Sequence, residues 1–294
     1  MKSFLPFVFV VVSLQNVFSQ VSCEPLVFKN KLSKTIPNIQ KNPNEYISYA
    51  LQKEFYYYIH QHDSAGHHMA SITQWYSQNG KKSLPQWEGV YYYLQGRAID
   101  GKDKLLALAH FQKALQFFRE KKDKAGEINA LLAISQLNMT NYGERSGSLE
   151  YLLENAREAA KLAREINCEE LELRSMGLEA SLYLSRSHLN MKKYSELILK
   201  MNQMSKLGRV SPVMRADIYT NLSNVYAAQN DFKTAELYLL KAISLYDALK
   251  TSKKRILAEI NLSILYGRQG QFEKTIALSK QILVKNPTAS SAVK

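Results

Sequence analysis

Two stretches of helical periodicity meet at a short polar turn between residues 216 and 247. In the first stretch, apolar or small residues recur every three or four positions, at Tyr219, Leu222, Ser223 and Tyr226. The second stretch repeats this spacing at Phe232, Ala235, Leu239 and Ala242. Such spacing is typical of one helix face. The pattern predicts two antiparallel helices around residues 229–231, and a hairpin of this kind buries its apolar face only against further hairpins.

These residues resemble a tetratricopeptide repeat (TPR). The family's order of bulky, Leu, small, Tyr, Ala, bulky and Ala is met at Tyr219, Leu222, Ser223, Tyr226, Ala235, Leu239 and Ala242, whereas Asp247 replaces the closing Pro. The resemblance implies an all-α, right-handed α-solenoid of about six antiparallel hairpins. It also implies a binding scaffold, because such a fold by itself carries no chemistry.

The other hairpins are predicted from the same periodicity. A first helix from Asn44 is expected to bury a face made of Tyr46, Tyr49, Ala50, Lys53 and Tyr57, and its partner is expected at about 65–78. The following helices are expected at 87–99, 105–121, 124–139 and 149–166, with a degenerate unit at 178–207 and a final unit at 256–287. The polar segment 141–148 interrupts the third hairpin, and a long loop on a repeat scaffold is a candidate functional element.

The expected repeat period is longer than that of the TPR family. Tyr226 and Tyr266 occupy matching positions 40 residues apart, whereas the family period is about 34. Extended repeats of 38–40 residues resemble those of exported bacterial TPR proteins and regulator input arrays. We expect an array over 44–289, best formed at 216–249 and 256–289, followed by a polar tail at 290–294.

The first 43 residues have a different composition. Lys2 followed by an apolar run to Leu14 and small residues ending at Ser19 predicts a secretory signal peptide over 1–19, cleaved after Ser19. Residues 20–43 contain Pro25, Pro37 and Pro43 and predict an irregular tether. No later stretch is apolar enough to span a membrane. The protein is therefore expected to be exported, periplasmic or extracellular.

The two cysteines leave two questions open. Lipid attachment at Cys23 is disfavoured because Gln20 occupies the position where a lipoprotein signal has an apolar residue. Cys23 and Cys168 could form a disulfide in an exported chain. Two unpaired thiols are the favoured prediction.

Charge and motifs exclude several function classes. The net charge of +13 raises nucleic-acid binding as a weaker alternative, but the basic residues fall in short clusters at expected turns and helix ends. No phosphate-binding loop, zinc spacing, nucleophile elbow or paired-carboxylate motif appears. We therefore predict a non-enzyme without a cofactor. Four histidines close together form a weak candidate for a metal site, namely His60, His62, His67 and His68. The candidate is weak because no pair of them has the i,i+4 spacing of ligands on one helix face.

The leading functional prediction is an exported scaffold that binds a peptide or partner protein in the concave groove of the array. In a TPR array the first helix of each hairpin lines this groove. The expected partner-facing residues are Arg186, Asn190, Thr220, Asn224, Ile264 and Arg268. The alternative is the sensory input array of a signalling regulator, in which a further segment would follow an array that lacks a capping helix.

Overall fold

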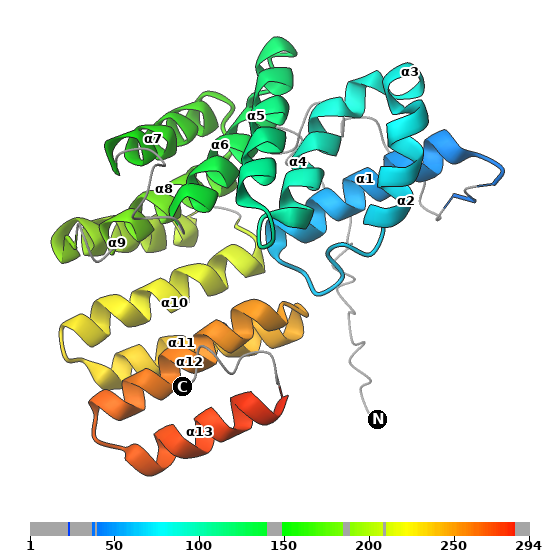
Figure 1. Ribbon diagram of the computed structural model, residues 1–294. Helices are drawn as coiled ribbons and strands as arrows, with labels where there is room; N and C mark the ends of the chain where they lie inside the picture. Colours follow the sequence, from blue (N-terminus) through cyan, green and yellow to red (C-terminus); the bar gives the residue numbers. More distant parts are fainter. Residues whose placement is uncertain are drawn as a thin grey trace, which may run out of the picture.

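A chain of antiparallel helices forms the part of the protein that the computed structural model describes, which is Cys23, Pro37, Asn38, 40–139, 149–184, 189–207 and 210–285. No strand occurs within these residues. The longer helices are α1 (Pro43–His60), α4 (Glu88–Ile99), α5 (Lys104–Glu120), α6 (Lys124–Met139), α7 (Leu149–Glu165), α8 (Glu169–Tyr183), α9 (Met191–Leu207), α10 (Pro212–Ala228), α11 (Phe232–Ala248), α12 (Ser252–Arg268) and α13 (Phe272–Lys285). They stack as successive hairpins (Figure 1). The expected signal peptide, the 141–148 loop and the 290–294 tail lie outside the described residues.

The two hairpins predicted with the clearest pattern are confirmed. Helices α10 and α11 meet at residues 229–231, and α12 and α13 repeat the arrangement. Ser223, Ala235, Leu222 and Leu239 are all buried. Leu222 joins an apolar cluster with residues of α8 and α9, and Leu239 joins a cluster with residues of α12. Asp231 begins α11 because its carboxylate accepts a hydrogen bond from the Thr234 amide at 3.1 Å, which satisfies a free donor of the first turn.

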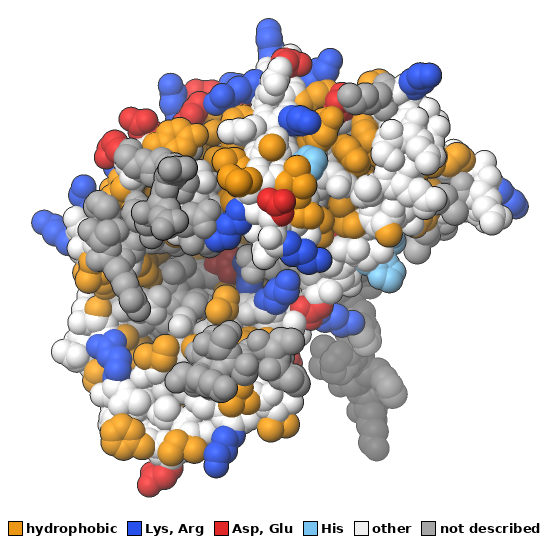
Figure 2. Space-filling view, in the orientation of Figure 1, with side chains coloured by type: hydrophobic (Ala, Val, Ile, Leu, Met, Phe, Trp, Pro, Cys, Tyr) orange, Lys and Arg blue, Asp and Glu red, His pale blue; other side chains and the backbone are white. Residues whose placement is uncertain are grey.

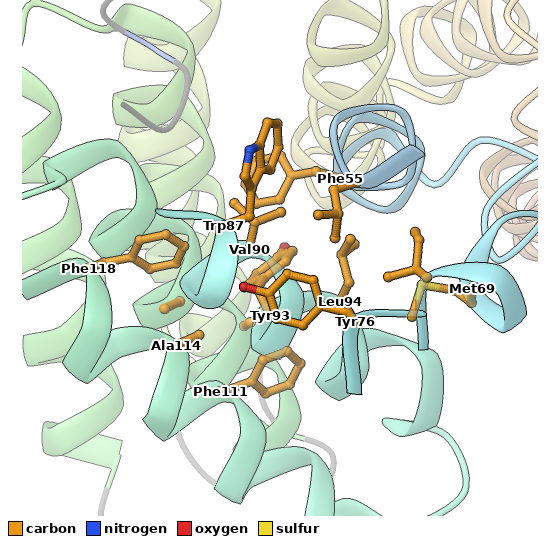
Figure 3. Close-up of a cluster of buried hydrophobic side chains, with 14 of the residues drawn as sticks. Phe55, Met69, Tyr76, Trp87, Val90, Tyr93, Leu94, Phe111, Ala114 and Phe118 are labelled. Carbon is orange, nitrogen blue, oxygen red and sulfur yellow. The ribbon is translucent and has the colours of Figure 1, made fainter. Parts of the chain in front are cut away.

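A large apolar cluster holds the N-terminal hairpins together. Aromatic side chains from α1, α4 and α5 converge there, including Phe55, Tyr93 and Phe111, and Trp87 joins them from the 3₁₀ turn (Pro85–Trp87) before α4 (Figure 3). The face of α1 that enters this cluster differs from the predicted one. Ala50 is buried as predicted, but Ile47, Leu51 and Phe55 join it and Lys53 is exposed. Side chains without a polar group take the core positions, and the predicted tyrosines lie at its half-exposed edge.

The fourth hairpin begins earlier than the sequence predicts. Helix α8 starts at Glu169 and ends at Tyr183, and Cys168 precedes it with a sulfur that accepts a hydrogen bond from the Leu171 amide at 3.4 Å. The predicted helix began at 178 because the first two turns of α8 carry several glutamates. First helices therefore begin at Glu88, Lys124, Glu169, Pro212 and Ser252. Their spacing is uneven, and a regular 38–40-residue period is not confirmed.

Cys23 and Cys168 form a disulfide across 145 residues of sequence. The prediction of two free thiols is therefore wrong. Cys168 is buried at the α7–α8 turn, and Cys23 packs against the apolar cluster that surrounds it. This contact between distant segments leaves no periodic signal in the sequence.

Candidate functional site

Hydrogen bonds and ion pairs join each first helix to the next and form a continuous row of polar side chains. The contacts link α4 to α6, α6 to α8, α8 to α10 and α10 to α12 in turn. The pairs are Arg97–Gln136 at 3.4 Å, Asn129–Arg174 at 2.7 Å, Glu170–Ser211 at 2.5 Å and Asp217–Lys254 at 2.7 Å. We call these eight residues the inner polar row. It holds the first helices in fixed register.

The inner polar row faces the end of α1, which places it on the inner side of the array. His60 is the last residue of α1. The positive charges of Arg174 on α8 and Lys254 on α12 are close enough to lower its pKa. Helices α8 and α12 are separated by α10, so the first helices must curve around the end of α1. Figure 2 shows the corresponding face hollowed between the part with α7–α9 and the part with α10–α13.

Residues 61–68 connect α1 to α2 (Met69–Trp75) and cross to the opposite end of the array; we call this segment the clasp. The Asp63 carboxylate accepts hydrogen bonds from the Ser252 amide at 2.9 Å and the Ser252 hydroxyl at 2.6 Å. The Asp63 amide donates to the Lys250 carbonyl at 3.1 Å. Figure 1 shows this loop descending from α1 to the turn between α11 and α12. The clasp thus joins the first hairpin to the last two.

A buried carboxylate keeps the clasp in shape. Glu54 on α1 accepts hydrogen bonds from the amides of Gly66 and His68, both at 2.6 Å. Gly66 has a positive φ of 94°, a conformation that favours glycine. The predicted helix over 65–78 therefore begins only at Met69, because the preceding amides bond to Glu54 instead of continuing a helix.

Arg174 is the centre of the inner polar row. Its guanidinium is part-buried and donates to Asn129, whose amide nitrogen donates to the Ala125 carbonyl at 2.8 Å and so fixes the orientation of the oxygen. Burial lowers the pKa of Arg174, and the charge of Arg97 acts in the same direction. The charge is therefore held at a site where water solvates it poorly.

Polar groups on α10 are fixed by a second network. Asp217 binds the Lys254 ammonium and accepts a hydrogen bond from the Tyr246 hydroxyl at 2.6 Å. Asn224 donates to the Tyr194 hydroxyl at 3.3 Å. Burial raises the pKa of Tyr194 to about 12, so this hydroxyl keeps its proton at neutral pH. Asp217 and Asn224 are therefore each held by a hydrogen bond or ion pair within the protein.

The structure places the predicted partner-facing residues unevenly. Arg186 lies outside the described residues. Asn190 precedes α9 and accepts a hydrogen bond from the Lys193 amide at 3.0 Å, so it caps that helix instead of lying on a first helix. Thr220 and Asn224 share α10, and Thr220 lies 3.3 Å from the Tyr246 hydroxyl. On α12, Ile264 is exposed, and Arg268 donates to the Ala227 carbonyl at 2.9 Å and lies over the Phe232 ring.

The four predicted metal-candidate histidines do not form a ligand set. Within the described part of the chain, no group of three or more His, Cys, Asp or Glu could hold a metal ion. His60 lies against the Tyr56 ring at 4.4 Å, and His62 accepts a hydrogen bond from the Ser64 amide at 3.1 Å. His67 and His68 contact each other edge-on. His60 ends α1, and the other three histidines lie in the clasp.

None of the eight residues of the inner polar row was among the predicted partner-facing residues. The sequence offers one signal, because Arg174 is the one basic residue in α8 and has Leu173, Ser175 and Met176, which are buried, beside it. The basic residues on the face seen in Figure 2 are dispersed. None of the helices in the described ranges has both the length and the apolarity needed to cross a bilayer.

Comparisons with known proteins identify the fold. No protein-family model and no curated protein matches the chain. Among solved structures, the chain is similar to a Rap protein complexed with Competence and Sporulation Factor, with a TM-score of 0.63 and 13% identity over 85% of this chain and 67% of that chain. It is also similar to NprR in complex with its cognate peptide NprX, with a TM-score of 0.61 and 13% identity over 88% of this chain and 70% of the other.

A third similar structure is the apo form of the quorum sensor NprR from B. thuringiensis. Its TM-score is 0.57, with 14% identity over 85% of this chain and 68% of that chain. At these identities the likeness concerns the fold alone. The chain has a TPR-like, all-helical repeat fold.

Proposed function

We propose that the protein is a non-enzymatic binding protein that holds a peptide, or an extended segment of a partner protein, against the inner polar row. The observation that carries this proposal is the continuous set of hydrogen-bonding side chains on consecutive first helices, each held in place by a neighbour. An extended chain exposes a donor or an acceptor at every residue. Prearranged side chains bind such a chain at a low ordering cost.

Two similar structures support this choice of ligand. The NprR structure contains its cognate peptide, and the Rap structure contains Competence and Sporulation Factor. The described part of this chain resembles them over most of its length. A shared fold supports many functions. The chemical class of the ligand is therefore inferred from the residues of this chain.

The test uses a library of random linear hexapeptides and the purified chain with its disulfide intact. Bound peptides are identified by mass spectrometry, and their affinities are measured by fluorescence anisotropy. Gln136→Ala on α6, an exposed member of the inner polar row, should weaken binding by about three- to tenfold, the value of one lost hydrogen bond. Gln203→Ala, an exposed glutamine on the second helix α9, is the matched control. The proposal fails if no hexapeptide binds saturably, or if both variants bind as tightly as the wild type.

We also propose that the protein is exported. The disulfide between Cys23 and Cys168 supports this location, because disulfides persist in oxidising compartments. Expression with the native N-terminus followed by cell fractionation tests it. A fractionated product whose mass corresponds to cleavage after Ser19 is expected, and an intact chain in the cytoplasmic fraction would contradict export.

The regulator alternative is a second candidate, supported by the similarity to the quorum sensor NprR. An input module must change shape when its signal binds. Small-angle scattering with and without a captured hexapeptide tests this requirement. An unchanged scattering profile at saturation favours a static scaffold.

A further inference from the structure

The guanidinium of Arg174 is incompletely partnered on the inner face of the array. Among the described residues, its one hydrogen bond goes to the neutral side chain of Asn129 at 2.7 Å. Among the described residues, no carboxylate oxygen lies within 4.0 Å of it. An arginine carries five donors, and a charge removed from water is costly unless it is paired. Arg174 therefore retains donors that an anionic ligand could use.

The carboxylates nearby are engaged by other groups. Glu170 and Asp217 both act electrostatically on Arg174. Glu170 accepts two hydrogen bonds from Ser211, at 2.8 and 2.5 Å, and thereby fixes the start of α10. Asp217 is bound by Lys254 and Tyr246. Neither carboxylate can move to Arg174 without leaving a part-buried partner unsatisfied.

A second cation near the site is also incompletely partnered. The Nε of Arg97 is buried and has no hydrogen-bond partner among the described residues. Its Nη1 makes only long contacts, at 3.4 Å to Asp100 and 3.4 Å to Gln136. His60 faces the same region, and burial lowers its pKa to about 3, so the imidazole is neutral at neutral pH. These groups favour an anionic ligand.

We propose that Arg174, with Arg97 as a second cation, binds a carboxylate of the ligand, either a C-terminal carboxylate or an Asp or Glu side chain. This inference rests on the proposed peptide-binding function and specifies the chemistry of its ligand. A guanidinium offers two parallel donors to a carboxylate. Asn129 holds the guanidinium by one edge, which leaves its remaining donors for a ligand.

Three small probes with a shared backbone test the site: N-acetylalanine, N-acetylaspartic acid α-amide and N-acetylalanine amide. They carry a terminal carboxylate, a side-chain carboxylate and no carboxylate, respectively. Nitrogen-15 NMR of the arginine Nε–H groups reports binding. We expect a saturable shift of the Arg174 signal with one or both acids and none with the amide. The acid that binds more tightly identifies the source of the carboxylate.

Variants separate the site from a general charge effect. Arg174→Gln should weaken binding of the acid probes, and of acidic hexapeptides, at least about tenfold. Arg174→Lys keeps the charge but lacks the planar pair of donors, so it should give an intermediate loss. Arg164→Gln is the matched control, because Arg164 is exposed on α7 and pairs with Glu172. Melting temperatures check that each variant folds.

The outcomes distinguish this inference from the proposed function. If hexapeptides do not bind but the acid probes shift Arg174, the peptide-binding function is wrong and the carboxylate site stands. If hexapeptides bind but Arg174→Gln retains wild-type affinity for the acids and for acidic peptides, the inference is overturned. Absence of a saturable shift with both acids also overturns it.

Discussion

Leu222 and Leu237 show how differently one residue type contributes to this array. Leu222 on α10 is fully buried, whereas Leu237 on α11 is 50% exposed. Leu222→Ala should lower the free energy of unfolding by about 2–5 kcal/mol, because it removes buried apolar surface and leaves a cavity. Leu237→Ala should change it by less than about 0.5 kcal/mol. Urea unfolding followed by circular dichroism measures both, and equal losses would contradict the assigned packing.

His60 should make the stability of the protein sensitive to acid. Burial, together with the charges of Arg174 and Lys254 and the nearby His62, lowers its pKa to about 3 from an ordinary 6.5. At pH values between 3 and 6.5, His60 binds a proton in the unfolded chain but not in the folded chain. The free energy of unfolding should therefore fall as the pH drops from 6.5 towards 3. His60→Gln should reduce this loss.

Urea unfolding at several pH values checks the contribution of His60. His67→Gln serves as the control, because His67 lies in the clasp and its side chain is exposed. The proposed contribution is absent if the wild type and the His60→Gln variant lose stability in parallel between pH 6.5 and 4.

At the residue scale, the sequence predicted packing better than the polar site. The apolar positions of α10 and α11 follow from periodicity, because burial on one helix face repeats every three or four residues. Arg174 and Lys254 could not be assigned in this way. Their positions across from Asn129 and Asp217 depend on how consecutive hairpins stack, and polar residues on inner and outer faces are of the same types.

Among the elements, helix bounds were predictable where local signals were strong. Helix α6 spans the predicted residues, and the α10–α11 turn lies at the predicted position. The start of α8 is not predicted because its first turn carries three glutamates and because Cys168 is an uncommon N-terminal cap. Within the clasp, residues 65–68 are not helical as predicted, because the sequence cannot show that Glu54 accepts hydrogen bonds from the Gly66 and His68 amides.

The disulfide should stabilise the α7–α8 turn by tying it to the N-terminal segment. Cys23 and Cys168 close a loop of 145 residues, and cross-links of this kind typically contribute about 2–4 kcal/mol. Reduction with dithiothreitol should therefore lower the urea midpoint of the wild type. A Cys23→Ser, Cys168→Ser double variant should start at the lower midpoint and not respond to reductant. Two free thiols in the untreated protein would contradict the disulfide.

For the whole molecule, local repeats and one long-range contact act together. Each hairpin packs on its neighbours, so the array could in principle have any curvature that its junctions allow. The clasp adds a contact between residues 189 positions apart, from Asp63 to Ser252. No repeat pattern predicts such a contact. It bonds the first hairpin to the α11–α12 junction, and we expect it to limit the width of the face that carries the inner polar row.

Asp63→Ala should therefore widen the array. The variant loses the bonds from the Ser252 amide and hydroxyl, which together contribute about 1–3 kcal/mol, and keeps only the backbone contact to Lys250. Spin labels on cysteines introduced at the exposed positions Lys53 on α1 and Lys253 on α12 report the separation by pulsed electron paramagnetic resonance. We expect a longer and broader distance distribution than in the wild type.

Asp247→Ala, which removes an exposed carboxylate from α11, should leave the distribution unchanged. If Asp63→Ala gives the wild-type distance distribution, the packing of the repeats sets the curvature of the array and the clasp does not contribute to it.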